Sequence, residues 1–145
     1  MDLAKVTTIW QDNLTFNADV DGFNIKMDVI KDKGGNDTGP RPKTLLLAAL
    51  SGCSGMDVAS ILAKMRVFDY QLEIKTEAES TDEHPKIYKT IAMKFQFKGE
   101  NLPKDKLINA VELSITKYCG VHAMLNKASI ITSSIFINDQ EVWHD

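Results

Sequence analysis

Alternating apolar and polar residues predict β-strands in the first third of the chain. Apolar side chains recur at every second position over 14–20 and again over 23–29. This period of two is typical of a strand with one buried face. Between the two runs, Asp21-Gly22 predicts a tight hairpin, because the favoured turn needs positive φ at both residues. Residues 6–10 fit a further strand, and the glycine- and proline-rich residues 31–42 indicate a loop.

A long helix is predicted over residues 44–65. Its segment Leu45–Leu50 is apolar on all sides, so the helix is expected to be central and buried. A chain of this size has few elements to cover such a helix, and two copies buried between two sheets would solve that. The small residues 51–55 fit either close approach by a neighbouring element or a functional surface, and the sequence leaves both open.

The rest of the pattern predicts two strands over 70–76 and 91–97, a helix opened by Pro103 and a last strand over 130–137. Gly120 can break or bend that helix. The order is therefore β-β-β-α-β-β-α-β. Runs of strands separated by two helices favour an α+β fold with antiparallel sheets. The 145 residues suit one domain spanning 1–145.

Composition and charge exclude several classes of protein. The net charge of −3 disfavours a basic nucleic-acid binder. The longest uninterrupted apolar run, Leu45–Leu50, is much shorter than a membrane span, and no signal segment is recognised near the N-terminus. We therefore expect a soluble cytoplasmic protein that contacts neither nucleic acid nor membrane.

The chain has two cysteines, Cys53 and Cys119. Two are too few for a disulfide scaffold or for a structural zinc site, which usually needs four Cys or His ligands. No histidine stands at paired ligand spacing from a cysteine, so no metal and no bound cofactor are expected. A cysteine within a helix is most often a packing residue.

Each cysteine also has neighbours with chemical potential. On a helix, Cys53 shares its face with Met56 and Asp57, so a carboxylate stands one turn from the thiol. His122 follows Cys119 by three residues and shares its face if Gly120 does not break the helix. An imidazole there could accept the thiol proton or, when charged, favour the thiolate.

Two motifs carry a family resemblance. Residues 42–57 read PKTLLLAALSGCSGMD and resemble the first-cysteine motif of the OsmC/Ohr family. Residues 117–125 read KYCGVHAML and resemble its second-cysteine motif. The element order matches from about Thr7 to Asn138, and KYC is similar to the less characterised OsmC-like branch.

The resemblance implies an intertwined homodimer, with antiparallel sheets wrapped around central helices. Members of the Ohr and OsmC type reduce organic hydroperoxides in the oxidative stress response. By position, Cys53 would be the peroxidatic residue that becomes a sulfenic acid. Cys119 would resolve it as a disulfide, which an external dithiol, often a lipoyl-protein, reduces.

The chain departs from the family pattern beside the first cysteine. Active peroxidases carry a glutamate after the motif's proline, where this chain has Lys43, and an arginine in the N-terminal strands, where residues 1–40 have none. Lys43 could supply a cation across the dimer, but lysine lacks arginine's rigid fork. Asp57 disfavours a thiolate, because like charges repel. We therefore expect weak thiol-dependent peroxidase activity or a different function of the thiols.

Two alternative functions compete with that of an enzyme. One is a binding protein that holds a small hydrophobic molecule in the dimer cleft, with Met56 and Met65 lining it. The other is a purely structural or partner-binding dimer. The missing arginine and glutamate favour the binding protein, whereas two cysteines within their motifs favour the enzyme.

Overall fold

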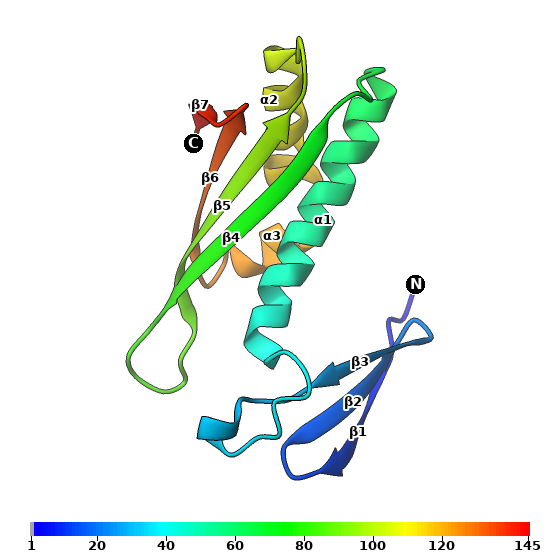
Figure 1. Ribbon diagram of the computed structural model, residues 1–145, viewed down its shortest axis with the longest axis vertical. Helices are drawn as coiled ribbons and strands as arrows, with labels where there is room; N and C mark the ends of the chain where they lie inside the picture. The colour runs from blue at the N-terminus through cyan, green and yellow to red at the C-terminus, as the bar shows by residue number, and fades with distance from the viewer. Residues whose placement is uncertain (1) are drawn as a thin grey trace. The chain divides into compact units, whose positions relative to one another are not determined.

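The computed structural model describes residues 2–145 and divides into two compact units, of which the first ends at Leu46 and the second runs from Leu47 to Asp145 (Figure 1). The expectation of a single domain over 1–145 stays a prediction. The α+β class and the order of the main elements are confirmed.

The first unit contains a three-stranded antiparallel sheet of β1 (Val6–Asp12), β2 (Thr15–Val20) and β3 (Phe23–Met27), in the order β1-β2-β3. Asp21 and Gly22 have φ of 53° and 84° in the turn between β2 and β3. Positive φ at both central residues is the geometry of the favoured two-residue hairpin. The predicted hairpin is therefore confirmed.

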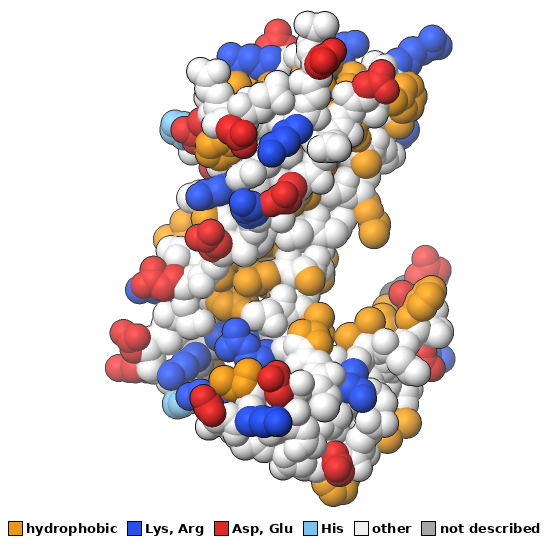
Figure 2. All heavy atoms as spheres, in the orientation of Figure 1, with side chains coloured by type: hydrophobic (Ala, Val, Ile, Leu, Met, Phe, Trp, Pro, Cys, Tyr) orange, Lys and Arg blue, Asp and Glu red, His pale blue; other side chains and the backbone are white. Residues whose placement is uncertain are grey.

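This sheet leaves much apolar surface uncovered. Every residue of β1 is exposed, and Phe23 is 72% exposed. Figure 2 shows hydrophobic side chains at the surface of the chain. Large exposed apolar patches mark interaction surfaces. The exposed large apolar residues of the strands and their first turn are Val6, Ile9, Trp10, Leu14, Phe16 and Phe23.

Asp28 organises the loop that follows β3 and its short helix η1 (Lys31–Lys33). Its buried carboxylate accepts hydrogen bonds from the hydroxyls of Thr38 at 2.6 Å and Thr15 at 2.9 Å. The backbone N–H groups of Val29, Asn36 and Thr38 also donate to it. These bonds, that of the Thr38 side chain first, hold the pKa of Asp28 far below its ordinary value. The predicted loop is therefore tied to one carboxylate.

The second unit is built on a four-stranded sheet in the order β4-β5-β6-β7. Its strands are β4 (Gln71–Ser80), β5 (Tyr88–Lys98), β6 (Ile130–Ile137) and β7 (Gln140–His144). The sheet is mixed, not wholly antiparallel as expected, because β5 and β6 run parallel. The connection between them holds α2 (Lys104–Leu113), a π-helical turn η2 (Ser114–Tyr118) and α3 (Gly120–Leu125). Such a helical crossover brings the chain back to the end at which β5 began.

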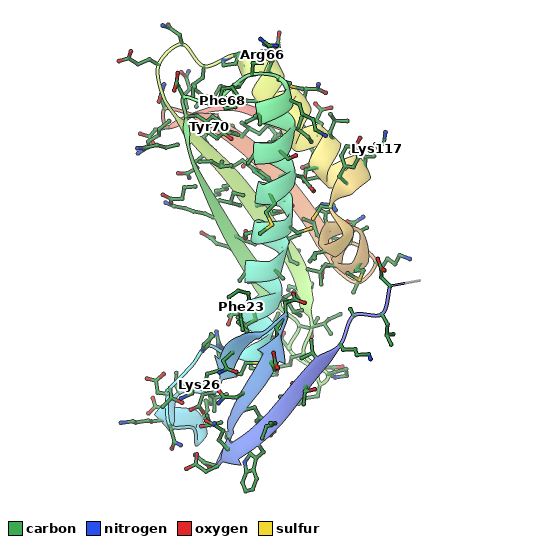
Figure 3. The ribbon with its side chains drawn as sticks, turned by 90° about the vertical axis from the view of Figure 1, so that its right-hand side faces the viewer. Phe23, Lys26, Arg66, Phe68, Tyr70 and Lys117 are labelled. Atoms are coloured by element: carbon green, nitrogen blue, oxygen red, sulfur yellow. The ribbon has the colours of Figure 1, made fainter. Side chains whose placement is uncertain are left out.

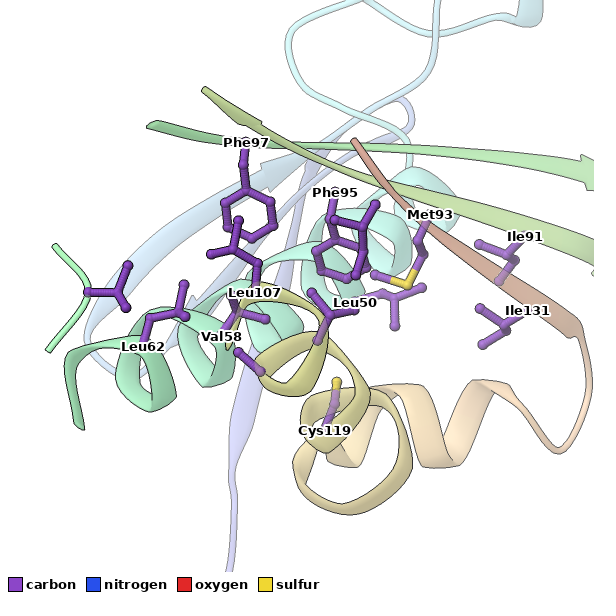
Figure 4. Packing of buried hydrophobic residues seen from close by; sticks show 14 residues of the cluster. Leu50, Val58, Leu62, Ile91, Met93, Phe95, Phe97, Leu107, Cys119 and Ile131 are labelled. Atoms are coloured by element: carbon purple, nitrogen blue, oxygen red, sulfur yellow. The ribbon is translucent and has the colours of Figure 1, made fainter. Parts of the chain in front are cut away.

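Helix α1 (Pro42–Lys64) places one stripe in the core of this unit. The stripe repeats every four residues, which is one turn of helix. It packs with the inward side chains of β5 and with α2 (Figure 4). The predicted alternation of β5 is confirmed, since its four inward residues are at most 1% exposed. The buried residues are Leu50, Ser54, Val58 and Leu62 from α1 and Ile91, Met93, Phe95 and Phe97 from β5.

The remaining surface of α1 is apolar but largely uncovered in the single chain. Within Leu45–Leu50 only Leu50 is buried, and Leu46 is 46% exposed. The length of α1 and its mean hydropathy of 1.7 over 18 residues also meet the criterion for a membrane span. The length of the longest uninterrupted apolar run did not indicate this. Core helices of soluble proteins meet the same criterion, and the stripe of α1 lies in the core. The helix therefore has the surface expected of an element that needs further apolar cover.

The small residues of α1 differ in role. A Cβ added at Gly55 would lie 3.1 Å from Ile74 Cδ1 of β4, whereas one added at Gly52 would meet nothing within 4 Å of it. Close approach to the sheet thus explains Gly55. It does not explain Gly52.

Candidate functional site

The two cysteines come together inside the second unit. Cys53 lies midway along α1, and Cys119 directly precedes α3. Their Sγ atoms and a carboxylate oxygen of Asp57 all lie within 4.8 Å of one another. Both thiols are free; Cys53 is half-buried and Cys119 is 3% exposed, with its side chain in the packed interior (Figure 4). The expected proximity of the two thiols is confirmed.

The π turn sets the position of Cys119. The backbone N–H of Cys119 donates to the carbonyl of Ser114 at 2.8 Å, and its own φ and ψ of −74° and 102° are extended. The helix therefore breaks at Cys119, one residue before Gly120. Such wider turns within helices occur often at functional sites. Lys117 of the same turn lies on its outer side, away from α1 (Figure 3), with Nζ 5.3 Å from the centre of the Tyr118 ring.

This break changes the predicted contact between Cys119 and His122. Cys119 caps α3, and its Sγ accepts a hydrogen bond from the backbone N–H of His122 at 3.3 Å. The sequence predicted a contact through the imidazole, but the contact that the structure describes is through the backbone. His122 is buried, which lowers its pKa, while the Asp145 carboxylate acts in the opposite direction. Its ring is therefore neutral near pH 7.

Two serines that the sequence did not single out complete the site. Ser54 Oγ donates to Cys119 Sγ at 3.3 Å. Ser114 Oγ lies 3.0 Å from Asp57 Oδ2 and 3.4 Å from the Ser54 carbonyl oxygen, and it can donate to either. Both serines are fully buried. A small polar residue on the buried face of a predicted helix was the only signal in the sequence.

These contacts act on Cys119 in opposite directions. Burial raises the pKa of Cys119, and the neighbouring thiol of Cys53 raises it further. The hydrogen bonds from Ser54 and from the His122 backbone lower it, because they stabilise the thiolate. Burial prevails, so the pKa lies above that of an ordinary thiol.

The other predicted residues lie at different places. Lys43 is on the first turn of α1, nearly three turns before Cys53. Met56 is 76% exposed, and Met65 follows the end of α1 and packs against the core. A pocket of about 300 Å³ opens beside Asp57, and neither methionine lines it. Its lining residues are Asp57, Ser60, Ile61, Lys64, Leu113 and Tyr118.

The family model described as OsmC-like protein matches residues 34–134. Protein YhfA of Escherichia coli strain K12 is 37% identical over 126 residues, which cover 86% of this chain and 91% of YhfA. The crystal structure of a hypothetical protein from Aquifex aeolicus VF5 has a TM-score of 0.84 and 30% identity, covering 95% and 98% of the two chains. The organic hydroperoxide resistance protein OhrB of Bacillus subtilis shares the fold, with a TM-score of 0.61 and 15% identity over 94% and 98%. The chain belongs to the family of OsmC-like proteins.

Proposed function

We propose that this protein is a thiol-dependent redox protein that reduces organic hydroperoxides slowly, through Cys53 and Cys119. The observation that carries the proposal is the pair of free thiols whose sulfurs lie within 4.8 Å. The half-buried Cys53 is the more accessible of the two, so it is the one that meets the peroxide. Membership of a family that includes organic hydroperoxide resistance proteins supports the same chemistry.

The reaction proceeds in three balanced steps. The thiolate of Cys53 attacks one peroxide oxygen, the O–O bond breaks, and the alcohol leaves with a proton from solvent while Cys53 becomes a sulfenic acid. Cys119 then attacks that sulfur, forming a disulfide and releasing water. An external dithiol reduces the disulfide and is itself oxidised, which restores both thiols.

The surroundings of the thiols account for slow turnover. Asp57 is within 4.8 Å of both sulfurs, and a nearby carboxylate disfavours a thiolate. The motif has Lys43 where active relatives have glutamate, and residues 1–40 contain no arginine to stabilise the anion. An ordinary thiol of pKa about 8.5 is only about 3% ionised at pH 7. A thiol without a stabilising partner reacts slowly with peroxide, because the thiolate is the nucleophile.

The working unit is a homodimer in the cytoplasm. Support comes from apolar surfaces that the single chain leaves uncovered: the Leu45–Leu50 segment of α1 and the strand β1, all of whose residues are exposed. A second copy that covers both would remove this surface from water.

The test is oxidation of the reduced protein with one equivalent of cumene hydroperoxide, followed by mapping of disulfides. We expect one Cys53–Cys119 disulfide within each chain. With Cys119→Ser, dimedone should trap a sulfenic acid on Cys53, and with Cys53→Ser peroxide consumption should stop. Free thiols alone, or links only between chains, would refute the redox pair.

The same experiment separates the proposal from its alternative. A protein that keeps both thiols under peroxide yet retains an apolar dye or fatty acid would instead be a binding protein for small hydrophobic molecules. Met56 and Met65 would then be tested as lining residues of the dimer cleft.

A further inference from the structure

We propose that the reduced site binds one Zn²⁺ ion per chain through Cys53 Sγ, Cys119 Sγ and a carboxylate oxygen of Asp57, with one position left open. Spacing along the chain indicated no metal site, but the fold brings these three ligand atoms within 4.8 Å of one another. Three protein ligands with a fourth open position are a common arrangement for zinc that binds a further molecule.

The geometry suits a tetrahedral ion after a small adjustment. Zinc binds sulfur at about 2.3 Å and carboxylate oxygen at about 2.0 Å, so two sulfur ligands lie about 3.8 Å apart. The two sulfurs, which lie within 4.8 Å of each other, need to approach by at most about 1 Å. Cys53 and Asp57 are four residues apart on α1 and therefore point to the same side of the helix. Cys119 completes the set from the start of α3.

Asp57 and Cys119, the two other proposed ligands, already have hydrogen-bond donors around them. Ser114 Oγ lies 3.0 Å from Asp57 Oδ2 and orients the carboxylate. Cys119 Sγ accepts from Ser54 Oγ and from the His122 backbone N–H, each at 3.3 Å. Donors to the ligand atoms are what holds metal ligands in position in zinc sites. The fold therefore prepares the ligands rather than merely bringing sulfurs close.

Charge also favours a divalent cation here. Two thiolates and a carboxylate would place three negative charges within 4.8 Å, and the contacts described for them come from serine hydroxyls and a backbone N–H, which carry no positive charge. A Zn²⁺ ion would reduce this local charge to −1. Soft thiolates select zinc over magnesium or calcium. Asp57 also lines the pocket of about 300 Å³, so one of the three proposed ligands faces that pocket.

Binding and oxidation exclude each other. Zinc uses both sulfurs as thiolates, and the two thiol protons pass to solvent, with no change in oxidation state. Disulfide formation consumes the same two thiolates and would release the ion. The inference requires reduced thiols but does not depend on peroxide reduction.

The full-length, fully reduced protein is first titrated with Co²⁺ alone under anaerobic conditions. Zn²⁺ then displaces the cobalt, and competition with a chromophoric chelator measures the zinc affinity. We expect one ion per chain and a sulfur-to-cobalt charge-transfer band. Cys119→Ser and Cys53→Ser should each halve that band. Asp57→Asn should keep the band, because both sulfurs remain, but weaken zinc affinity at least tenfold. Asp69→Asn, which changes an exposed carboxylate elsewhere in the same unit, is the matched control and should bind as the parent protein does.

Circular dichroism of each variant checks that it is folded. Failure of the parent protein to bind either ion would refute the site. Equal zinc affinity in the parent and in Asp57→Asn would also refute it, because the ion would then be held by a bare dithiol. If the protein forms the Cys53–Cys119 disulfide but binds no zinc, the proposed function stands and this inference is refuted. If it binds zinc but forms no disulfide, the inference stands and the proposed function is refuted.

Discussion

Replacing Ser54 by alanine tests how strongly one hydrogen bond stabilises the thiolate of Cys119. Ser54 Oγ donates to Cys119 Sγ at 3.3 Å, and the two residues are 0% and 3% exposed. The substitution removes a single oxygen atom and keeps helix propensity. The contact from Ser114 to this residue involves its backbone carbonyl and is retained.

The size of the effect follows from the contact. A hydrogen bond to a charged group contributes about 1.5–3 kcal/mol, and a long bond to sulfur belongs at the lower end. About 1.4 kcal/mol corresponds to a factor of ten in an ionisation equilibrium. Ser54→Ala should therefore raise the pKa of Cys119 and reduce its thiolate fraction about tenfold at any pH well below that pKa. The hydrogen bond from the His122 backbone N–H to Cys119 Sγ remains and limits the loss of thiolate stabilisation.

The assay is a pH titration by nuclear magnetic resonance of cysteine labelled with carbon-13 at Cβ. A Cys53→Ala background leaves Cys119 as the only thiol. Ser51→Ala is the matched control: it lies one turn earlier on α1, and its Oγ contacts the Leu47 carbonyl and Thr76 Oγ1 instead of sulfur. An unchanged or lower Cys119 pKa in Ser54→Ala, or an equal rise in Ser51→Ala, would show that burial alone governs this thiol.

Three further predictions concern stability and assembly. The pKa of Asp28 is lowered, first by the hydrogen bond from Thr38, so its ionised carboxylate stabilises the fold above pH 3.8 and this stability is lost as the pH falls below that value. Asp28→Asn should therefore flatten the pH dependence of the urea unfolding midpoint below about pH 4. An unaltered slope would contradict this. Burial lowers the pKa of His122, so the protein should lose stability as the pH falls below 6.5, where the histidine of the unfolded chain takes up a proton. His122→Gln should abolish this loss in thermal unfolding scans, whereas replacement of the exposed His84 should not. Phe23→Ser, at a side chain 72% exposed in the single chain, should shift the proposed dimer towards monomer in sedimentation velocity, and a dimer as stable as the parent would exclude this surface from the interface.

Local chemistry was enough for the elements whose causes are local. The hairpin at Asp21-Gly22 depends on two residues that tolerate positive φ, and both adopt it. The inward alternation of β5 follows from the period of two along a strand. The α1 helix was predicted within two residues at its start and one at its end, because its apolar and small residues continue without a breaker. The two cysteine motifs likewise stand out in the sequence itself.

Tertiary structure decided what depends on residues far apart in the chain. Ser54 and Cys119 are 65 positions apart, and nothing near either one shows that a hydroxyl will meet a sulfur. The break at Cys119 and the parallel pairing of β5 with β6 depend on how the α2–α3 crossover packs against α1 and the sheet. Asp28 looked like one more polar strand residue until the loop closed around its carboxylate. Periodicity identifies an element and its buried face, but hydrogen-bond partners across the fold are chosen only when the faces pack together.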